Sequence, residues 1–221
     1  MAPDKIRPGV SSAIKLWNSS ELSDWEETFT SYEECQIIVD KSLKNAQIKL
    51  SKTSFTENDK WKMLQLPKLM DSKGHITLDQ LEQLMVWKLR RGQYRPTLMA
   101  LIRRNSSKSV VETSTKAFSI LSSENCPDNI AEAFSILTSL HGVGPATASL
   151  ILSIFLPDTV PFMSDEAMDA AIGLPRCYTT VQYRKLCHAL TEKAKNLGNE
   201  WTIEMVEKSL FTAAVLGRSE N

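Results

Sequence analysis

The chain has 221 residues, enough for one large domain or two small ones with a substantial core. Its 26 Lys and Arg residues balance its 26 Asp and Glu residues, and the pI is about 6.8. DNA-binding proteins usually carry a basic excess, so this balance argues against tight nonspecific DNA affinity but allows a local basic surface. No signal peptide is expected from the N-terminal pattern, and no apolar run is long enough to cross a bilayer. We therefore expect a soluble, intracellular protein with no membrane contact.

The four cysteines are scattered along the chain, at Cys35, Cys126, Cys177 and Cys187, and form no CxxC pair. Their spacing indicates neither a zinc site nor an iron–sulfur cluster. We interpret them as reduced thiols of an intracellular protein. No resident cofactor is expected.

Apolar residues recur at helical spacing along most of the chain. After a short helical piece at 14–17, the first long helix is expected near Ser31, where Glu34 completes a Ser-x-x-Glu capping box. Another begins at Thr77, with Gln80 in the same role, and stops at Gly92. No segment alternates with period two, so the prediction is an all-α fold. Further helices are expected at 55–70, 97–104, 110–121, 129–140, 147–156, 166–172, 180–196 and 202–216.

The most informative stretch is 140–165, LHGVGPATASLILSIFLPDTVPFMSD. Gly142 and Gly144 permit a tight turn and a close approach to the main chain. Pro145 suits the first position of a helix, and 147–156 is so apolar that this helix must be buried. The N-terminus of such a helix presents free N–H groups and the positive end of a dipole, which favour an anion. Without a P-loop pattern elsewhere, the natural anion is a nucleic-acid phosphate.

The segment LHGVGPATAS, followed by an aspartate at 165, resembles the hairpin of the helix-hairpin-helix (HhH-GPD) DNA glycosylase superfamily. In that family the hairpin binds the DNA backbone, and an essential aspartate follows about twenty residues later at the start of the next helix. Here Asp165 follows Ala146 by 19 residues, which matches that register. The resemblance covers only a short part of the chain, and some relatives carry an iron–sulfur loop that this chain lacks.

The resemblance also implies an architecture of two helical subdomains with a cleft between them. Residues 55–156 would form a central subdomain that ends in the helix-hairpin-helix. Residues 1–54 and 157–221, from both ends of the chain, would together form the other. Composition alone does not predict this division.

Asp165 is the expected catalytic residue. Cleavage of the bond between a base and its sugar develops positive charge on the sugar, and a carboxylate there stabilises the cation and can activate water. The alternative is a helix cap, because Ser164, Asp165 and Glu166 are typical of a first helical turn. Glu166 and Asp169 are interpreted as solvated charges on the face of the helix.

The hairpin residues expected to contact DNA are Gly142, Val143 and Gly144, through backbone amides, and Thr147, through its hydroxyl group. Relatives often hold a monovalent cation on hairpin carbonyls, which here would be those of Leu140 and Val143. The alternative is a plain turn between two tightly packed helices.

Ala146 occupies the position at which strand-cutting relatives keep a lysine nucleophile. Alanine cannot form a Schiff base, so the resemblance implies a monofunctional enzyme that uses water.

A second informative stretch, 87–96, is basic and combines four cations and two aromatic residues around Gly92. Such a composition is typical of a loop that contacts phosphates or stacks on bases. In the resembled family, loops of this kind insert side chains where the target base is flipped out. The alternative is a cationic helix C-terminus that complements the dipole, with Trp87 and Tyr94 in the core. The candidate contacts are Arg90, Arg91, Gln93, Tyr94 and Arg95.

A flipped base needs a pocket with aromatic or apolar walls. Phe162 and Met163 directly precede Asp165 and are the first candidates, and Trp17 is a candidate by type. Large apolar residues more often belong to the core.

The leading hypothesis is a monomeric base-excision repair protein, nuclear if the source is eukaryotic, that flips a damaged or mispaired base from double-stranded DNA and hydrolyses its N-glycosidic bond. Two alternatives stay open: a non-catalytic helix-hairpin-helix DNA-binding module, and a helical interaction protein that binds no nucleic acid. The sequence does not identify the base.

Overall fold

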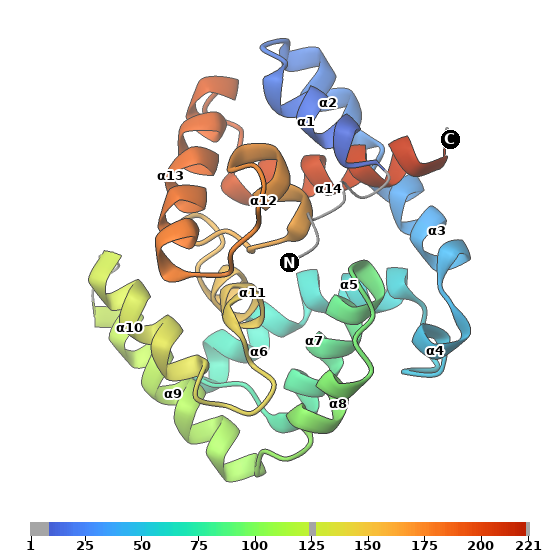
Figure 1. Ribbon diagram of the computed structural model, residues 1–221. Helices are drawn as coiled ribbons and strands as arrows, with labels where there is room; N and C mark the ends of the chain where they lie inside the picture. Colours follow the sequence, from blue (N-terminus) through green and yellow to red (C-terminus); the bar gives the residue numbers. More distant parts are fainter. Residues whose placement is uncertain (1–8, 124–126, 220–221) are drawn as a thin grey trace. The chain divides into compact units, whose positions relative to one another are not determined.

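The computed structural model describes residues 9–123 and 127–219, and within these ranges every regular element is a helix. The prediction of an all-α protein is therefore confirmed. None of these helices is both long enough and apolar enough to cross a membrane. The helices are α1 (Val10–Asn18), α2 (Leu22–Thr30), α3 (Tyr32–Ser42), α4 (Asn45–Ile48), α5 (Phe55–Leu64), α6 (Leu66–Lys73), α7 (Leu78–Arg91), α8 (Thr97–Ile102), α9 (Ser107–Ser123), α10 (Pro127–Leu137), α11 (Pro145–Phe155), α12 (Asp165–Ala171), α13 (Thr180–Leu197) and α14 (Ile203–Ser219) (Figure 1).

The chain divides into two compact units. The terminal unit comprises Met1–Ser42 and Leu156–Asn221, and the central unit comprises Leu43–Phe155. Residues 43–54 were expected to join the chain ends, but the structure groups them with the central unit. The reason is hydrogen bonding, because Gln47 donates to the carbonyl of Leu89 and Arg90 donates to several carbonyls of this segment.

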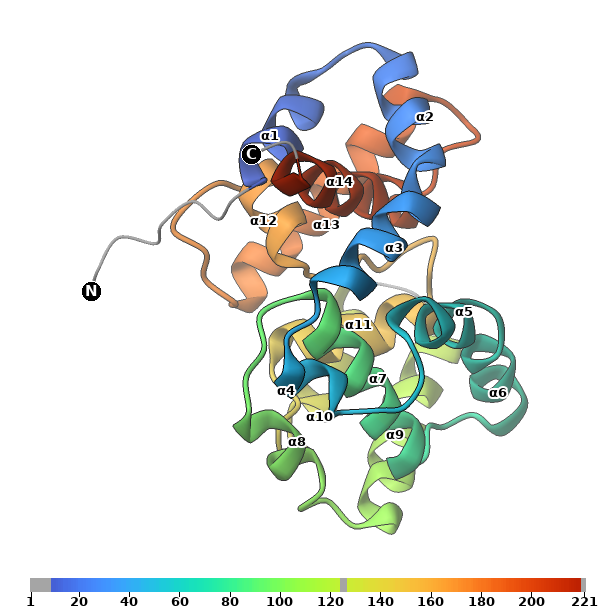
Figure 2. The same ribbon diagram turned by 90° about the vertical axis from the view of Figure 1, so that its right-hand side faces the viewer.

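Helix α14 lies at the middle of the terminal unit and packs against α1, α2, α3, α12 and α13 (Figure 2). Two glycines let α1 and α14 approach closely. A Cβ atom at Gly9 would lie 1.9 Å from the carbonyl oxygen of Ala214, and one at Gly217 would lie 2.0 Å from Oγ of Ser12. No larger residue fits at either position without moving one helix, because Gly9 packs against the backbone of α14 and Gly217 packs against Ser12 of α1.

Helix α7 forms the centre of the central unit and contacts α5, α8 and α9. The predicted capping box at its start is confirmed: Thr77 accepts from the Gln80 amide at 3.2 Å, and Gln80 accepts from the Thr77 amide at 2.8 Å. Trp87 is fully buried, and its indole N–H donates to Asp59 at 2.7 Å. Helices α9 and α10 lie side by side in both views (Figures 1 and 2).

The helix expected near Ser31 is α3, which begins at Tyr32, and the Ser31 carbonyl accepts the amide of Cys35 at 3.0 Å. The expected capping box is not seen, because the Ser31 hydroxyl group donates instead to the carbonyl of Glu27 at 2.9 Å, at the end of α2. Helix α2 was not expected, and its only buried residue is Trp25. The predicted helix 55–70 is two helices that meet at Gln65, because Pro67 lacks the amide proton that a continuous helix would use there.

Candidate functional site

The hairpin between α10 and α11 is a tight turn around Gly142, whose φ is +77°. Side chains rarely adopt this conformation, and a Cβ atom would also lie 3.0 Å from the backbone nitrogen of Ile102 and from Cβ of Leu101. The amide of Val143 donates to the carbonyl of Leu140 at 3.1 Å and closes the turn. Glycine at 142 is therefore required both for the turn and for its close packing on α8.

Asn105 holds the hairpin from the other side. Its side-chain amide donates to the carbonyl of His141 at 2.9 Å, and its side-chain oxygen accepts from the amide of His141 at the same distance. The same amide also donates to the carbonyl of Ile102 at 2.8 Å, at the end of α8. Sequence reasoning missed Asn105, because a single asparagine 36 residues before the hairpin gives no local signal.

The backbone amides of the hairpin are not equivalent. The amides of Val143 and Thr147 donate to carbonyls of the hairpin itself, at 3.1 and 2.9 Å. The amides of Gly142, Gly144 and Ala146 have no acceptor among the described residues. Gly144 is exposed, and Gly142 and Ala146 are half-buried. Three N–H groups, in the turn and in the first turn of α11, therefore have no acceptor within the described residues and could donate to an anion.

Two of the hairpin residues that were expected to contact DNA have side chains that face inward. Val143 and Thr147 are both only 3% exposed. The expectation that the Thr147 hydroxyl group contacts DNA is therefore wrong. The carbonyl of Leu140, one of the two expected cation ligands, accepts the amide of Val143. In the described part of the chain, no group of three or more His, Cys, Asp or Glu side chains is arranged to hold a metal ion.

The basic stretch 87–96 separates into buried and exposed parts. Arg90 is 3% exposed and donates to the carbonyls of Gln47 at 3.2 Å, Ser51 at 2.8 Å and Ile48 at 3.3 Å, and also to that of Thr53. Its guanidinium group therefore connects α7 to the segment 47–53 by hydrogen bonds, and the expectation that Arg90 contacts DNA is wrong.

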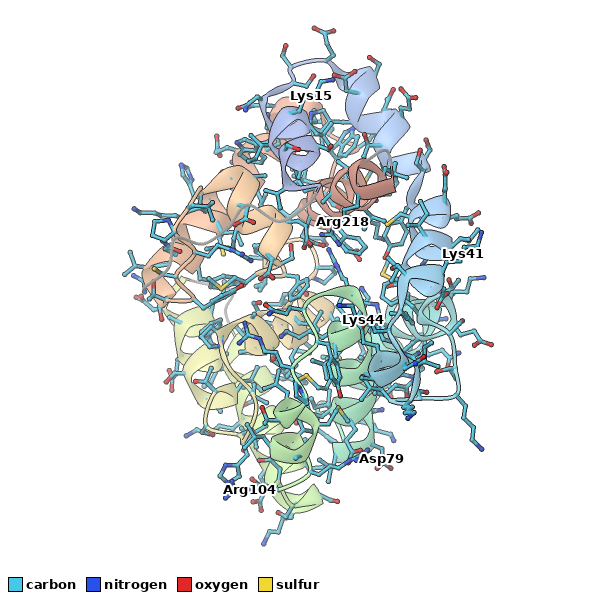
Figure 3. The ribbon with its side chains drawn as sticks, turned by 45° about the vertical axis from the view of Figure 1, so that its right-hand side comes forward. Lys15, Lys41, Lys44, Asp79, Arg104 and Arg218 are labelled. Atoms are coloured by element: carbon cyan, nitrogen blue, oxygen red, sulfur yellow. The ribbon has the colours of Figure 1, made fainter. Side chains whose placement is uncertain are left out.

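Arg91 is also buried, with its guanidinium carbon 5.1 Å from the centre of the Trp87 ring. Gln93 and Arg95 are exposed and Tyr94 is half-buried. These three residues precede α8, whereas the hairpin packs on the end of α8, so one short helix of about 9 Å lies between them. Arg104, just beyond the end of α8, is exposed and adds a further charge (Figure 3).

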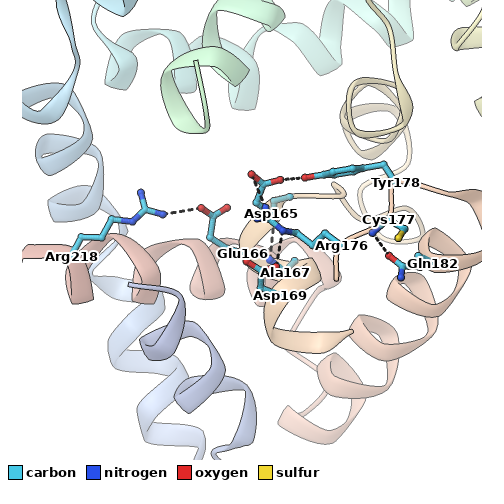
Figure 4. A network of polar contacts seen from close by, with 10 residues as sticks. Asp165, Glu166, Ala167, Asp169, Arg176, Cys177, Tyr178, Gln182 and Arg218 are labelled. Carbon is cyan, nitrogen blue, oxygen red and sulfur yellow. Dashed lines mark hydrogen bonds and ion pairs between the residues drawn. The ribbon is translucent and has the colours of Figure 1, made fainter. Parts of the chain in front are cut away.

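In the terminal unit, Asp165 is the first residue of α12. Ser164 caps this helix by accepting the Ala167 amide at 3.3 Å, so the cap is the serine rather than the aspartate. The Asp165 carboxylate forms an ion pair with Arg176 at 3.0 Å and also accepts a hydrogen bond from the Tyr178 hydroxyl group (Figure 4). The Asp165 side chain is 19% exposed, so solvent still reaches it.

Arg176 also pairs with Asp169 at 2.8 Å, and its side chain is only 8% exposed. Burial lowers the pKa of the Arg176 guanidinium, but the Asp165 and Asp169 carboxylates outweigh burial and leave that pKa raised. Glu166 pairs with Arg218 at 3.0 Å and is 4% exposed. Asp169 and Glu166 were expected to be solvated, and this was wrong, because each is buried against an arginine.

The candidate pocket residues are mostly interior. Met163 is fully buried and Phe162 is 9% exposed. Trp17 is half-buried, with the Lys193 ammonium nitrogen 4.9 Å from its ring centre and 2.8 Å from its carbonyl oxygen. Burial lowers the pKa of Lys193. Of these three residues, Phe162 and Trp17 retain some exposed surface, and Met163 belongs to the core.

The candidate residues thus fall into two groups. The hairpin and the exposed residues at 93–95 belong to the central unit, and Asp165, Phe162, Met163 and Trp17 belong to the terminal unit. Comparisons of the chain with models of protein families, with curated proteins and with solved structures found no match.

Proposed function

We propose that this protein is a monofunctional DNA glycosylase-like repair protein that acts as a monomer on double-stranded DNA inside the cell, in the nucleus if the source is eukaryotic. One observation carries the proposal. A glycine hairpin with three free amides opens α11, and a partly exposed aspartate begins the next helix, 19 residues after Ala146. This order of elements matches the helix-hairpin-helix glycosylases that the sequence resembles.

The central unit provides the proposed DNA contact. The free amides of Gly142, Gly144 and Ala146 suit a phosphate oxygen, and the dipole of α11 favours the negative charge. Residues 43–155 contain 15 Lys and Arg but only 9 Asp and Glu, so this part of the chain has the basic excess that the whole chain lacks. Arg95 and Arg104 are exposed and would add phosphate contacts.

The terminal unit provides the proposed chemistry. When the N-glycosidic bond breaks, its electron pair leaves with the base and positive charge develops on the sugar. The Asp165 carboxylate would stabilise that cation, and water would complete the hydrolysis. Ala146 offers no amine for a covalent intermediate, so an abasic site rather than a cut strand is the expected product.

The test is a panel of duplexes, each with one damaged or mismatched base, followed by hot alkali to convert abasic sites into strand breaks. We expect one class of duplex to be cleaved by wild type, and Asp165→Asn to lower the single-turnover rate by about 10³-fold with unchanged DNA binding. Asp158→Asn is the matched control, because Asp158 is an exposed carboxylate in the loop before α12. Strand breaks without alkali would contradict the monofunctional mechanism.

A second candidate is a non-catalytic DNA-binding module. It is favoured by one observation, that both oxygens of the Asp165 carboxylate are already engaged, by Arg176 and by Tyr178. Salt-sensitive binding to every duplex with no cleavage by wild type would select this candidate, since phosphate contacts release counterions. The absence of any salt-sensitive binding would reject both candidates and leave a helical protein with some other role.

A further inference from the structure

The loop 172–179, between α12 and α13, folds back onto the first turns of α12. It is fixed at both ends. Gly173, with a φ of +86°, donates its amide to the carbonyl of Met168 at 3.0 Å and closes α12. At the other end, the amide of Cys177 donates to the side-chain oxygen of Gln182 at 2.7 Å, and Thr179 caps α13. The loop therefore presents Arg176 and Tyr178 to α12 from a defined backbone.

Arg176 bridges two carboxylates of α12. Asp165 and Asp169 are four residues apart and so lie on the same face of the helix, where like charges repel. The guanidinium group meets Asp165 through one terminal nitrogen at 3.0 Å and Asp169 through Nε at 2.8 Å. Because Asp169 is 1% exposed, its ion pair fastens Arg176 to the helix. The contact with Asp165 is therefore made by a cation that is already held in place.

Tyr178 completes the surroundings of Asp165. Its hydroxyl group donates to the carboxylate oxygen that Arg176 does not contact (Figure 4). An ion pair on one oxygen and a hydrogen bond on the other fix the orientation of the carboxylate plane and favour the ionised form. Each carboxylate oxygen has a second lone pair. The side chain is 19% exposed, so the carboxylate is also accessible from solvent.

The contacts of Arg176 and Tyr178 with Asp165 are not needed to hold the loop 172–179 in place. The pair between Arg176 and Asp169 already ties the loop to α12, and the buried hydroxyl of Tyr183, which donates to the carbonyl of Pro161 at 3.0 Å, ties α13 to the segment before α12. The contacts with Asp165 instead act on one partly exposed carboxylate. An ionised carboxylate held by an arginine and a hydroxyl group is a poor proton acceptor but a strong electrostatic partner for a cation.

We infer that Arg176 and Tyr178 are positioning residues, which hold Asp165 ionised and in one orientation so that it stabilises the sugar cation electrostatically rather than by accepting a proton. The inference rests on the proposed glycosylase function. In the balanced reaction the base leaves with the electron pair of the C–N bond, water forms the new C–O bond, and the proton that water loses ends on the departing base. Asp165 gains and loses no atom.

The experiment measures the single-turnover rate against pH, on whichever duplex wild type cleaves, for Arg176→Gln, Arg176→Lys and Tyr178→Phe. Lys185→Gln is the control, because Lys185 is an exposed cation on α13. DNA affinity and thermal stability are measured in parallel. We expect Arg176→Gln to lower the rate by about 10²-fold at neutral pH, with unchanged affinity. Arg176→Lys should recover part of the loss, and Tyr178→Phe should cost about tenfold.

The shape of the pH profile separates positioning from a structural role. Without Arg176 the carboxylate is protonated more easily, so the loss of activity on the acid side should begin at a higher pH in Arg176→Gln than in wild type. A variant that is only less stable would keep the wild-type profile. If wild type cleaves no duplex, the proposed function fails and takes this inference with it. If wild type cleaves and Arg176→Gln keeps the wild-type rate and profile, only this inference is overturned.

Discussion

The central and terminal units have opposite charge. The central unit has an excess of six positive charges, from 15 Lys and Arg against 9 Asp and Glu, whereas the terminal unit has 11 Lys and Arg against 17 Asp and Glu. The neutral total is therefore the sum of two strongly charged parts. Net charge over a whole chain is a weak argument against DNA binding when the chain contains more than one folding unit, because phosphates respond to the local field.

The buried arginines of the two units have different partners. In the central unit Arg90 donates to backbone carbonyls, Arg103 pairs with Glu82, and Arg95 and Arg104 are exposed. In the terminal unit Arg176 and Arg218 are paired with carboxylates. These differences support the proposal that the central unit contacts DNA and that the terminal unit provides the chemistry. The largest expected effect is that Asp165→Asn lowers the reaction rate without weakening DNA binding. The following predictions test the proposed roles of the two units further.

Removing Arg90 should damage folding and not DNA contact. Arg90→Ala leaves four backbone carbonyls without their donor, and we expect the free energy of unfolding to fall by about 3 kcal/mol, measured by urea denaturation. Arg95→Ala, at an exposed position of the same stretch, should change stability by less than about 0.5 kcal/mol but weaken DNA binding. Equal stability of the two variants would contradict the structural role of Arg90.

Alanine at Gly142 should destabilise the protein more than alanine at Gly74. Gly142→Ala and Gly74→Ala both place alanine in a left-handed conformation, at φ +77° and +66°, which costs about 1 kcal/mol. Only at Gly142 does the new atom also meet the backbone of Ile102, at 3.0 Å, whereas nothing lies within 4 Å at Gly74. We expect Gly142→Ala to be about 1 kcal/mol the less stable of the two, and only Gly142→Ala to lose DNA affinity.

Removal of an exposed positive charge should weaken DNA binding in the central unit and not in the terminal unit. Arg104→Gln should lower DNA affinity and reduce the slope of log affinity against log salt by about one, because one phosphate contact is lost. Lys15→Gln removes an exposed charge from the terminal unit (Figure 3) and should leave both quantities unchanged. Binding titrations at several salt concentrations measure the two slopes. An equal change in both variants would break the assignment of DNA contact to the central unit.

The last prediction concerns cysteine chemistry in the terminal unit and leaves function unchanged. Burial raises the pKa of Cys187 to about 11, so below that pH its thiol stays protonated and unreactive. Cys177 is exposed in the loop 172–179. At pH 8 we expect iodoacetamide to label Cys177 at least about 10²-fold faster than Cys187, as followed by peptide mass spectrometry. Cys126 lies outside the described residues.

Features encoded within a few residues could be predicted from the sequence. Most of the helices, the capping box of Thr77 and Gln80 and the turn at Gly142 each depend on neighbouring residues, and these predictions are confirmed, whereas α2 and α4 were missed. Features that depend on distant partners could not be predicted. Arg90 was expected at the surface, because nothing near it in sequence indicates the carbonyls about 40 residues earlier that bury it.

The same limit applies to the candidate site. The position of Asp165 follows from the hairpin register, but its partners do not. Arg176 and Tyr178 lie 11 and 13 residues further on, in a loop whose path depends on the close of α12 at Gly173 and on the cap of α13. Asn105 is similar, since it reaches His141 from the far end of α8. In each case the partner is chosen by the tertiary fold, which local patterns do not describe.

The backbone contact between α1 and α14 has a consequence for biosynthesis. The central unit is one continuous segment and is complete once α11 has left the ribosome, so it can fold while the rest of the chain is still being made. The terminal unit cannot reach its final packing until α14 has emerged, because α14 touches every other helix of that unit. During translation the first three helices therefore lack their packing partner α14, which is encoded more than 150 residues later. Val10 and Trp25, which are buried in the folded protein, stay exposed until then.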